Sequence, residues 1–384
     1  MKIYENRWFG EFECLCGDCP QTCCRGWVIP LSDRDMDRFA NERGMLGLRL
    51  FFATGGRIRS KFNPDSGKCP FLRKDGLCQL QREKGHDFIP WTCQSYPRFY
   101  RNYGSFEERC LDLSCPGAAQ LFVKNRGALD VTEYEADPET RQCSTNDDEE
   151  YLEFLIRQRK RMTQLIRKGL TPDLADAVFL YAVKLQDLFA KGMTGDHEEL
   201  SFDDFYEKET DRKKLSFSYP LSPEVLREFL ASSLNHIRLK KVYPRLFSMF
   251  KSASEYLNMY GAGNASWRKH TEDFLKAEPF VAEIMGYYLS YYLWQYYLRS
   301  YETYSFRRQT ALGLCHMNMV LLLIMSGGGS GKITEESIAA TIAAYNRRAY
   351  FNDDILDEMY RIYEKNYAII LKTGRRDKTE DQEV

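Results

Sequence analysis

Cysteine is the residue that most constrains this chain. Eleven of its 12 cysteines fall between Cys14 and Cys143, and only Cys315 lies outside that stretch. The first 13 residues are charged and aromatic, with no apolar run typical of a secretion signal, so we expect a cytoplasmic protein. In a reducing compartment this density of cysteine favours metal or iron–sulfur ligation over disulfides.

Charge and hydropathy exclude two classes of partner. The chain has 54 basic and 55 acidic residues, a formal charge of −1, and so lacks the cationic field that drives nucleic-acid binding. Its longest apolar stretch, from Ala311 to Met325, is shorter than the ~20 apolar residues that cross a bilayer. We therefore expect no nucleic-acid partner and no membrane span.

The first 140 residues are expected to form a loop-rich, cysteine-rich metal-cluster module. Their periodic segments are short, and Ser32 predicts the start of a short helix over residues 33–40. A polar, acidic segment over residues 130–150 marks the boundary with the next domain. Metal is expected to replace much of the hydrophobic core in this module.

Residues 141–375 are expected to form an α-helical domain. Apolar residues recur at helical spacing over 152–166, and the pairs Thr171-Pro172 and Ser222-Pro223 predict two helix starts. Pro244 predicts a break, and Pro279 opens an aromatic helix that reaches about Arg299. Further helices are predicted over 310–325 and 334–349, followed by a disordered tail over 376–384. The predicted fold class is mainly α, with the loop-rich cysteine module first.

Eight cysteines in short clusters are the candidate metal ligands. Thiolates are soft ligands that select zinc, copper(I) or iron–sulfur clusters, and adjacent Cys23 and Cys24 do not easily bind one ion together. A multinuclear cluster or two separate sites would accommodate that pair, while two four-thiolate zinc sites or disulfides remain alternatives. The candidates are Cys14, Cys19, Cys23, Cys24, Cys69, Cys78, Cys93 and Cys115.

The residues around these cysteines resemble the flagellin lysine-N-methylase family. The resemblance rests on Phe12-Glu13-Cys14, Thr22-Cys23-Cys24 with Gly26-Trp27, Lys68-Cys69-Pro70-Phe71-Leu72, Tyr96-Pro97-Arg98 and Ser114-Cys115-Pro116. Cys16 and Cys110 are additional to the family pattern, and Gly117 stands where an acidic residue is expected. The resemblance covers the first 120 residues.

The resemblance implies a methyltransferase. It implies transfer of methyl groups from S-adenosylmethionine to lysine ε-amines of flagellin, with a [4Fe–4S] cluster on the enzyme. No Gly-x-Gly-x-x-Gly sequence follows a strand pattern, so a Rossmann-type methyltransferase is not indicated. The alternative is a non-enzymatic zinc- or iron–sulfur-binding module that serves electron transfer or structure.

Two further segments are interpreted mainly as structural. The basic run Arg157-Gln158-Arg159-Lys160-Arg161 is expected to form a solvated helix face. In the tyrosine-rich helix after Pro279, about half of the rings are expected to pack inward. A functional alternative is that these rings line a site for a lysine side chain, which an aromatic face attracts.

Overall fold

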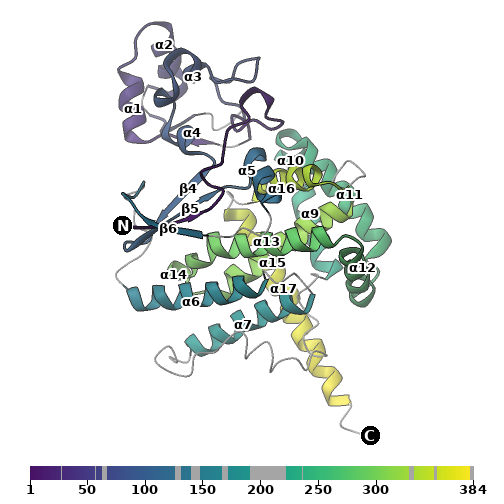
Figure 1. Ribbon diagram of the computed structural model, residues 1–384. Helices are drawn as coiled ribbons and strands as arrows, with labels where there is room; N and C mark the ends of the chain where they lie inside the picture. The colour runs from purple at the N-terminus through teal and green to yellow at the C-terminus, as the bar shows by residue number, and fades with distance from the viewer. Residues whose placement is uncertain are drawn as a thin grey trace.

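The computed structural model shows a mainly α-helical protein with a loop-rich cysteine module at its N-terminal end (Figure 1), as the sequence predicts. It describes residues 1–26, 28–56, 58–62, 67–125, 131–139, 148–166, 172–190, 222–235, 237–327, 333–349 and 353–380. Cys143 and Trp27 therefore lie outside the described residues.

The cysteine module contains short elements around a small core of its own. Ser32 begins α1 with a capping box, in which its hydroxyl accepts from the Asp35 N–H and the Asp35 carboxylate accepts from the Ser32 N–H, so the predicted helix start is confirmed. Phe39, Phe62 and Phe71 meet in the core. The elements are η1 (Cys16–Asp18), β2 (Ile29–Pro30), α1 (Asp33–Ala40), α2 (Gly44–Thr54), β3 (Lys61–Phe62), α3 (Gln79–Lys84), η2 (His86–Phe88) and α4 (Trp91–Ser95).

A four-stranded sheet, absent from the sequence prediction, joins the module to the helices. Its strands are β1 (Lys2–Asn6), β4 (Arg98–Asn102), β5 (Phe106–Leu111) and β6 (Val131–Glu135), in the order β4-β5-β1-β6. Strand β1 pairs parallel with β5 and antiparallel with β6. The sequence between β1 and β4 is thus a long excursion that leaves the sheet and returns to it.

The helices of the second half begin where proline predicts. Pro172, Pro223 and Pro279 start α7, α9 and α13, and Pro244 separates α10 from α11, so these expectations are confirmed. The helices are α5 (Pro116–Lys124), α6 (Glu149–Ile166), α7 (Pro172–Ala190), α9 (Pro223–Asn235), α10 (Ile237–Val242), α11 (Pro244–Tyr260), α12 (Asn264–Ala277), α13 (Pro279–Tyr296), η4 (Tyr297–Arg299), α14 (Ser300–Thr303), α15 (Phe306–Met325), α16 (Glu335–Ala349) and α17 (Asp353–Glu380).

One large core unites the sheet with these helices. Trp8 and Phe12 from the N-terminal end share it with α5, α13 and α15, so hydrophobic packing does not separate the chain at residue 140. Helix α15 is long and apolar enough to cross a membrane by length and composition, but 94% of its apolar window is buried inside the protein. It is the central core helix.

Helix α17 differs from the expectation for the C-terminal segment. It runs through residues 376–380 of the predicted disordered tail, and residues 381–384 lie outside the described part of the chain. Its C-terminal end points away from the other helices in Figure 1.

The expectation for the basic run in α6 is wrong at two positions. Gln158 and Arg159 are buried, at 3% and 7% exposure. The Arg159 guanidinium forms a bidentate ion pair with Glu108 of β5, and Gln158 accepts a hydrogen bond from Tyr181. The burial of Arg159 is explained by its buried acidic partner on a strand distant in sequence. The periodicity of one helix cannot reveal such a partner.

Candidate metal centre

The candidate site is a cavity of about 230 Å³ in the cysteine module, lined by nine thiols. All eight cysteines predicted as ligands lie in its wall, and Cys16 joins them. Cys110 lies elsewhere, buried in β5, and Cys315 is buried in α15. The fold therefore brings the predicted residues together from four separate stretches of sequence.

Short loops and helix ends deliver the thiols to the cavity. Cys14, Cys16 and Cys19 lie in and beside η1, where Cys16 adopts a left-handed conformation with φ of 47°. Cys115 is the N-cap of α5, where burial raises the pKa of its thiol and the nearby N–H groups of Ala118 and Gly117 partly offset that rise. Such N–H groups favour a thiolate at this position.

A β-hairpin delivers two more thiols. Leu72 and Cys78 form a β-bridge, so Cys69 and Cys78 lie at opposite ends of one tight turn. The Cys69 N–H donates to the Cys24 carbonyl at 2.8 Å, which fixes the loop of Cys24 beside the hairpin. Cys93 lies in the first turn of α4.

Most of these thiols are held in the protonated form in the metal-free chain. Burial raises the pKa of Cys69 to about 12 and that of Cys115 to about 11. Cys24 is the exception, because a hydrogen bond with the Cys23 thiol lowers its pKa to about 6 and raises that of Cys23. Metal binding must therefore displace protons from several buried sulfurs.

The donor set fits a thiophilic metal. The described cysteines are free thiols, which leaves the disulfide alternative without support. Among the described side chains, no group of three or more His, Cys, Asp or Glu converges on the position of a single ion. Among the described lining residues the one imidazole belongs to His86, so sulfur dominates the chemistry of the wall.

Sequence reasoning missed two residues that hold the cysteine loop from the helical half of the protein. Arg347, in the last turn of α16, donates to the backbone carbonyls of Gln21 (2.8 Å), Thr22 and Arg25. The Tyr243 hydroxyl donates to the carbonyl of Gly26. No local signal identifies either residue, because each contacts main-chain atoms more than 200 residues away. We call these four bonds the loop clamp.

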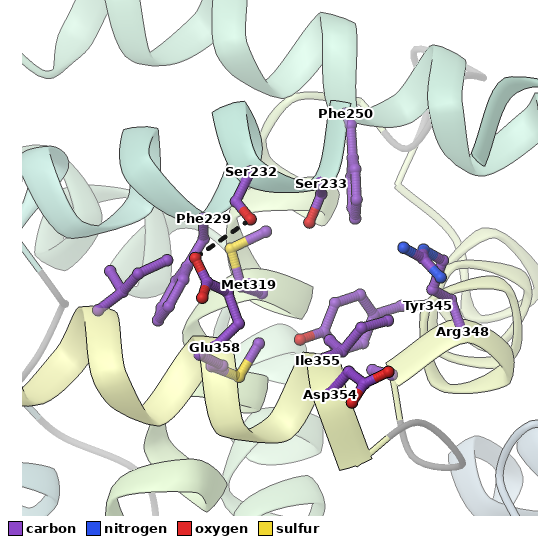
Figure 2. A pocket seen from close by; sticks show the side chains of 13 residues that line it. Phe229, Ser232, Ser233, Phe250, Met319, Tyr345, Arg348, Asp354, Ile355 and Glu358 are labelled. Atoms are coloured by element: carbon purple, nitrogen blue, oxygen red, sulfur yellow. Dashed lines mark hydrogen bonds between the residues drawn. The ribbon is translucent and has the colours of Figure 1, made fainter. Parts of the chain in front are cut away.

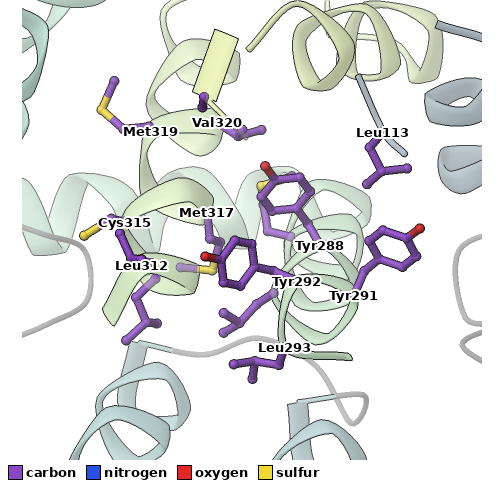
Figure 3. Close-up of a cluster of buried hydrophobic side chains, with 14 of the residues drawn as sticks. Leu113, Tyr288, Tyr291, Tyr292, Leu293, Leu312, Cys315, Met317, Met319 and Val320 are labelled. Carbon is purple, nitrogen blue, oxygen red and sulfur yellow. The ribbon is translucent and has the colours of Figure 1, made fainter. Parts of the chain in front are cut away.

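The tyrosines of α13 do not line this cavity. Figure 3 shows Tyr288, Tyr291 and Tyr292 packed among core residues that include Leu312 and Met317. These three rings are at most 2% exposed, and Tyr291 donates to the carbonyl of Leu111. Core packing, the structural interpretation of this helix, is therefore correct for them.

Two other cavities carry no comparable set of ligands. One of about 710 Å³ lies between the sheet and α6 and is bordered by Trp294 and the Glu108–Arg159 pair. A smaller one of about 140 Å³ lies between α9, α15 and α17 (Figure 2), where Glu358 and Ser232 interact at 3.5 Å. Neither contains a cysteine among its described lining residues.

Comparison with known proteins shows that most of the cavity wall belongs to a recognised domain. Residues 15–111 match the family described as a putative zinc- or iron-chelating domain, CxxCxxCC. Over 143 residues, which are 35% of its length, the chain is 25% identical to proteins named lysine-N-methylase from Salmonella typhimurium and Salmonella choleraesuis. A third of the chain is thus homologous to lysine-N-methylases.

The similarity is partial in both directions. The match spans 35% of the length of those two lysine-N-methylases and 83% of a protein from Salmonella muenchen named flagellar biosynthetic protein FliU, also at 25% identity. No solved structure matches the chain significantly. The chain thus contains a match to a chelating domain and, over about a third of its length, similarity to these relatives.

Proposed function

We propose that this protein is a protein-lysine N-methyltransferase that acts on flagellin in the cytoplasm, with no nucleic-acid or membrane partner. It takes methyl groups from S-adenosylmethionine and depends on a [4Fe–4S] cluster held by thiolates drawn from the eight predicted cysteines. The observation that carries the proposal is the nine-thiol cavity, in a chain of which about a third is similar to lysine-N-methylases.

The cavity wall offers surfaces for a lysine side chain. Phe12 and Tyr96 contribute aromatic rings to it, and these replace the α13 tyrosines as the rings that would contact the lysine stem. Enclosure against such rings removes water from the amine, which lowers the lysine pKa and favours the neutral, nucleophilic form. When bound, a thiolate-held cluster supplies either an electron or a Lewis-acidic anchoring point.

The test uses full-length protein purified without oxygen. We expect iron and acid-labile sulfide, and, with S-adenosylmethionine and flagellin from the same organism, methyl increments on flagellin lysines by mass spectrometry, measured with and without reductant. Cys69→Ser should remove them, whereas Cys110→Ser, outside the cavity, should retain them.

The alternative function is a non-enzymatic zinc- or iron–sulfur-binding module, which the matched chelating domain favours because its description includes no activity. An intact cluster without methyl increments under either condition would establish this alternative. Colourless protein with zinc and no sulfide would replace the iron–sulfur cofactor with zinc.

A further inference from the structure

The thiols of the cavity divide into two groups that belong to different parts of the fold. We define the sheet-side group as Cys14, Cys16, Cys19 and Cys115, and the hairpin-side group as Cys24, Cys69, Cys78 and Cys93. Cys23 forms a hydrogen bond with Cys24 and has Cys93 as a further electrostatic neighbour, so it lies beside the hairpin-side group.

The sheet-side group is assembled by the contact between η1 and the start of α5. The Cys16 N–H lies 3.4 Å from the Cys14 sulfur. A Cβ added to Gly117, in the first turn of α5, would lie 3.3 Å from the Phe12 ring and 3.5 Å from the Leu15 side chain. This close approach sets the N-cap Cys115 beside the Cys14 loop. Besides burial, the electrostatic neighbours of the Cys115 thiol include Cys19 and Cys14.

The hairpin-side group is assembled by backbone pairing. Cys24 and Cys69 are joined by a main-chain hydrogen bond, and Cys69 and Cys78 flank one hairpin. Besides burial, the electrostatic neighbours of the Cys93 thiol include Cys69, Cys24 and Cys78, all from this group.

Hydrophobic packing separates the hairpin-side group from Cys115. Cys69 belongs to the small core of the module, and Cys24, Cys78 and Cys93 pack against that core. Cys115 belongs to the large core shared with the helices. Cys14 and Cys16 are exposed, whereas the hairpin-side thiols are buried or partly buried.

We propose that the cavity holds two metal centres of four thiolates each, one on the sheet-side group and one on the hairpin-side group. Because no three of these thiols converge on the position of a single ion, each group of four suits a [4Fe–4S] cluster, whose four iron atoms take one thiolate each. The sheet-side centre goes beyond the matched chelating domain, which spans residues 15–111 and so excludes Cys14 and Cys115. The inference concerns metal binding alone and does not require methyl transfer.

The first test measures metal and sulfide per chain in anaerobically purified full-length variants. Cys115→Ser and Cys69→Ser should each reduce the metal content to about half of the wild-type value, and the double variant should lose nearly all of it. Cys110→Ser is the matched control, because its thiol is buried but lies outside the cavity, and should keep the full content. Loss of all metal from either single variant would show one shared cluster and overturn the proposal.

A second measurement needs no substitution and is independent of variant folding. Wild-type protein is treated with increasing chelator, and newly reactive thiols are labelled and located by mass spectrometry. The four sheet-side thiols, of which Cys14 and Cys16 are exposed, should become labelled together at lower chelator concentration than the hairpin-side thiols. Simultaneous labelling of all eight would contradict two centres, whatever the outcome of the methylation assay.

Discussion

Arg159 shows how one side chain supports the junction between sheet and helices. The two terminal nitrogens of its guanidinium each donate to one carboxylate oxygen of Glu108, and one of them also donates to the carbonyl of Trp294. Both side chains are less than 10% exposed, so neither charge is screened by water. Removal of one partner therefore leaves an uncompensated buried charge.

We expect Arg159→Ala to lower the free energy of unfolding by about 3–5 kcal/mol, the usual effect of breaking a buried pair. Arg157→Ala is the matched control, because the Arg157 side chain is 47% exposed and should change stability by no more than about 0.5 kcal/mol. Urea denaturation of both variants checks the prediction. Equal stability of the two variants would contradict it.

His316 is a buried residue with a pH signature. Burial lowers its pKa from an ordinary value of 6.5 to about 3, so the folded protein keeps the ring neutral. The unfolded chain binds a proton as pH falls below 6.5, which makes folding less favourable in acid. From pH 7 to pH 5 this group should cost about 2 kcal/mol of stability.

The measurement is the unfolding free energy at pH 7 and pH 5. His316→Gln should have a smaller loss between the two values than the wild type, whereas His86→Gln should match the wild type because His86 is exposed. An unchanged pH dependence in His316→Gln would rule out this histidine as the cause.

At the scale of elements, α13 and α15 pack closely through a glycine. A Cβ on Gly313 would lie 2.8 Å from the Tyr292 ring and 3.2 Å from Leu289. Gly313→Ala should therefore destabilise the protein by about 1–3 kcal/mol, although alanine is the better helix former. Gly10→Ala, with no atom within 4 Å of the new Cβ, should have little effect. Thermal denaturation compares the two, and a stabilised Gly313→Ala would refute the close packing.

Elements with local signals were predictable from sequence, and those that depend on distant partners were not. Proline and the Ser32 cap mark helix starts through local geometry and hydrogen bonds that involve only the first turn of the helix. Strand β5 is buried although it contains Glu107, Glu108 and Arg109, because Glu107 pairs with Arg109 on the same strand and Glu108 pairs with Arg159 of α6. Nothing in residues 106–111 alone reveals Arg159 as a partner. The cysteines of the cavity could be predicted as metal ligands because clustered thiols have few other roles. The loop clamp could not be predicted, because Arg347 and Tyr243 bind backbone carbonyls, which every residue carries.

At the scale of the whole molecule, the loop clamp connects the helical half to the candidate metal centre. Arg347→Ala removes three charge-assisted hydrogen bonds from the loop of Cys23 and Cys24. We expect metal to be extracted by chelator about tenfold faster than from the wild type. Arg347→Lys should give an intermediate rate, since it keeps the charge but loses the planar fork.

The matched control is Arg348→Ala, whose guanidinium borders the small cavity of Figure 2 and donates none of the four bonds of the loop clamp. Extraction followed by absorbance and metal analysis gives the rates. Identical rates for Arg347→Ala and Arg348→Ala would limit the clamp to a local structural contact.

The parallel pairing of β1 with β5 has a consequence for how the chain folds. Lys2 lies opposite Phe106, so the sheet must bring together residues about 100 positions apart, with the cysteine module between them. The free-energy cost of closing such a loop grows with the number of flexible residues in it. If the cysteine module folds first, most of the loop is already compact, and the cost falls by about 2 kcal/mol. Metal uptake by the nascent module would then favour formation of a sheet that contains no metal ligand, and supply of metal during synthesis would set the yield of folded protein.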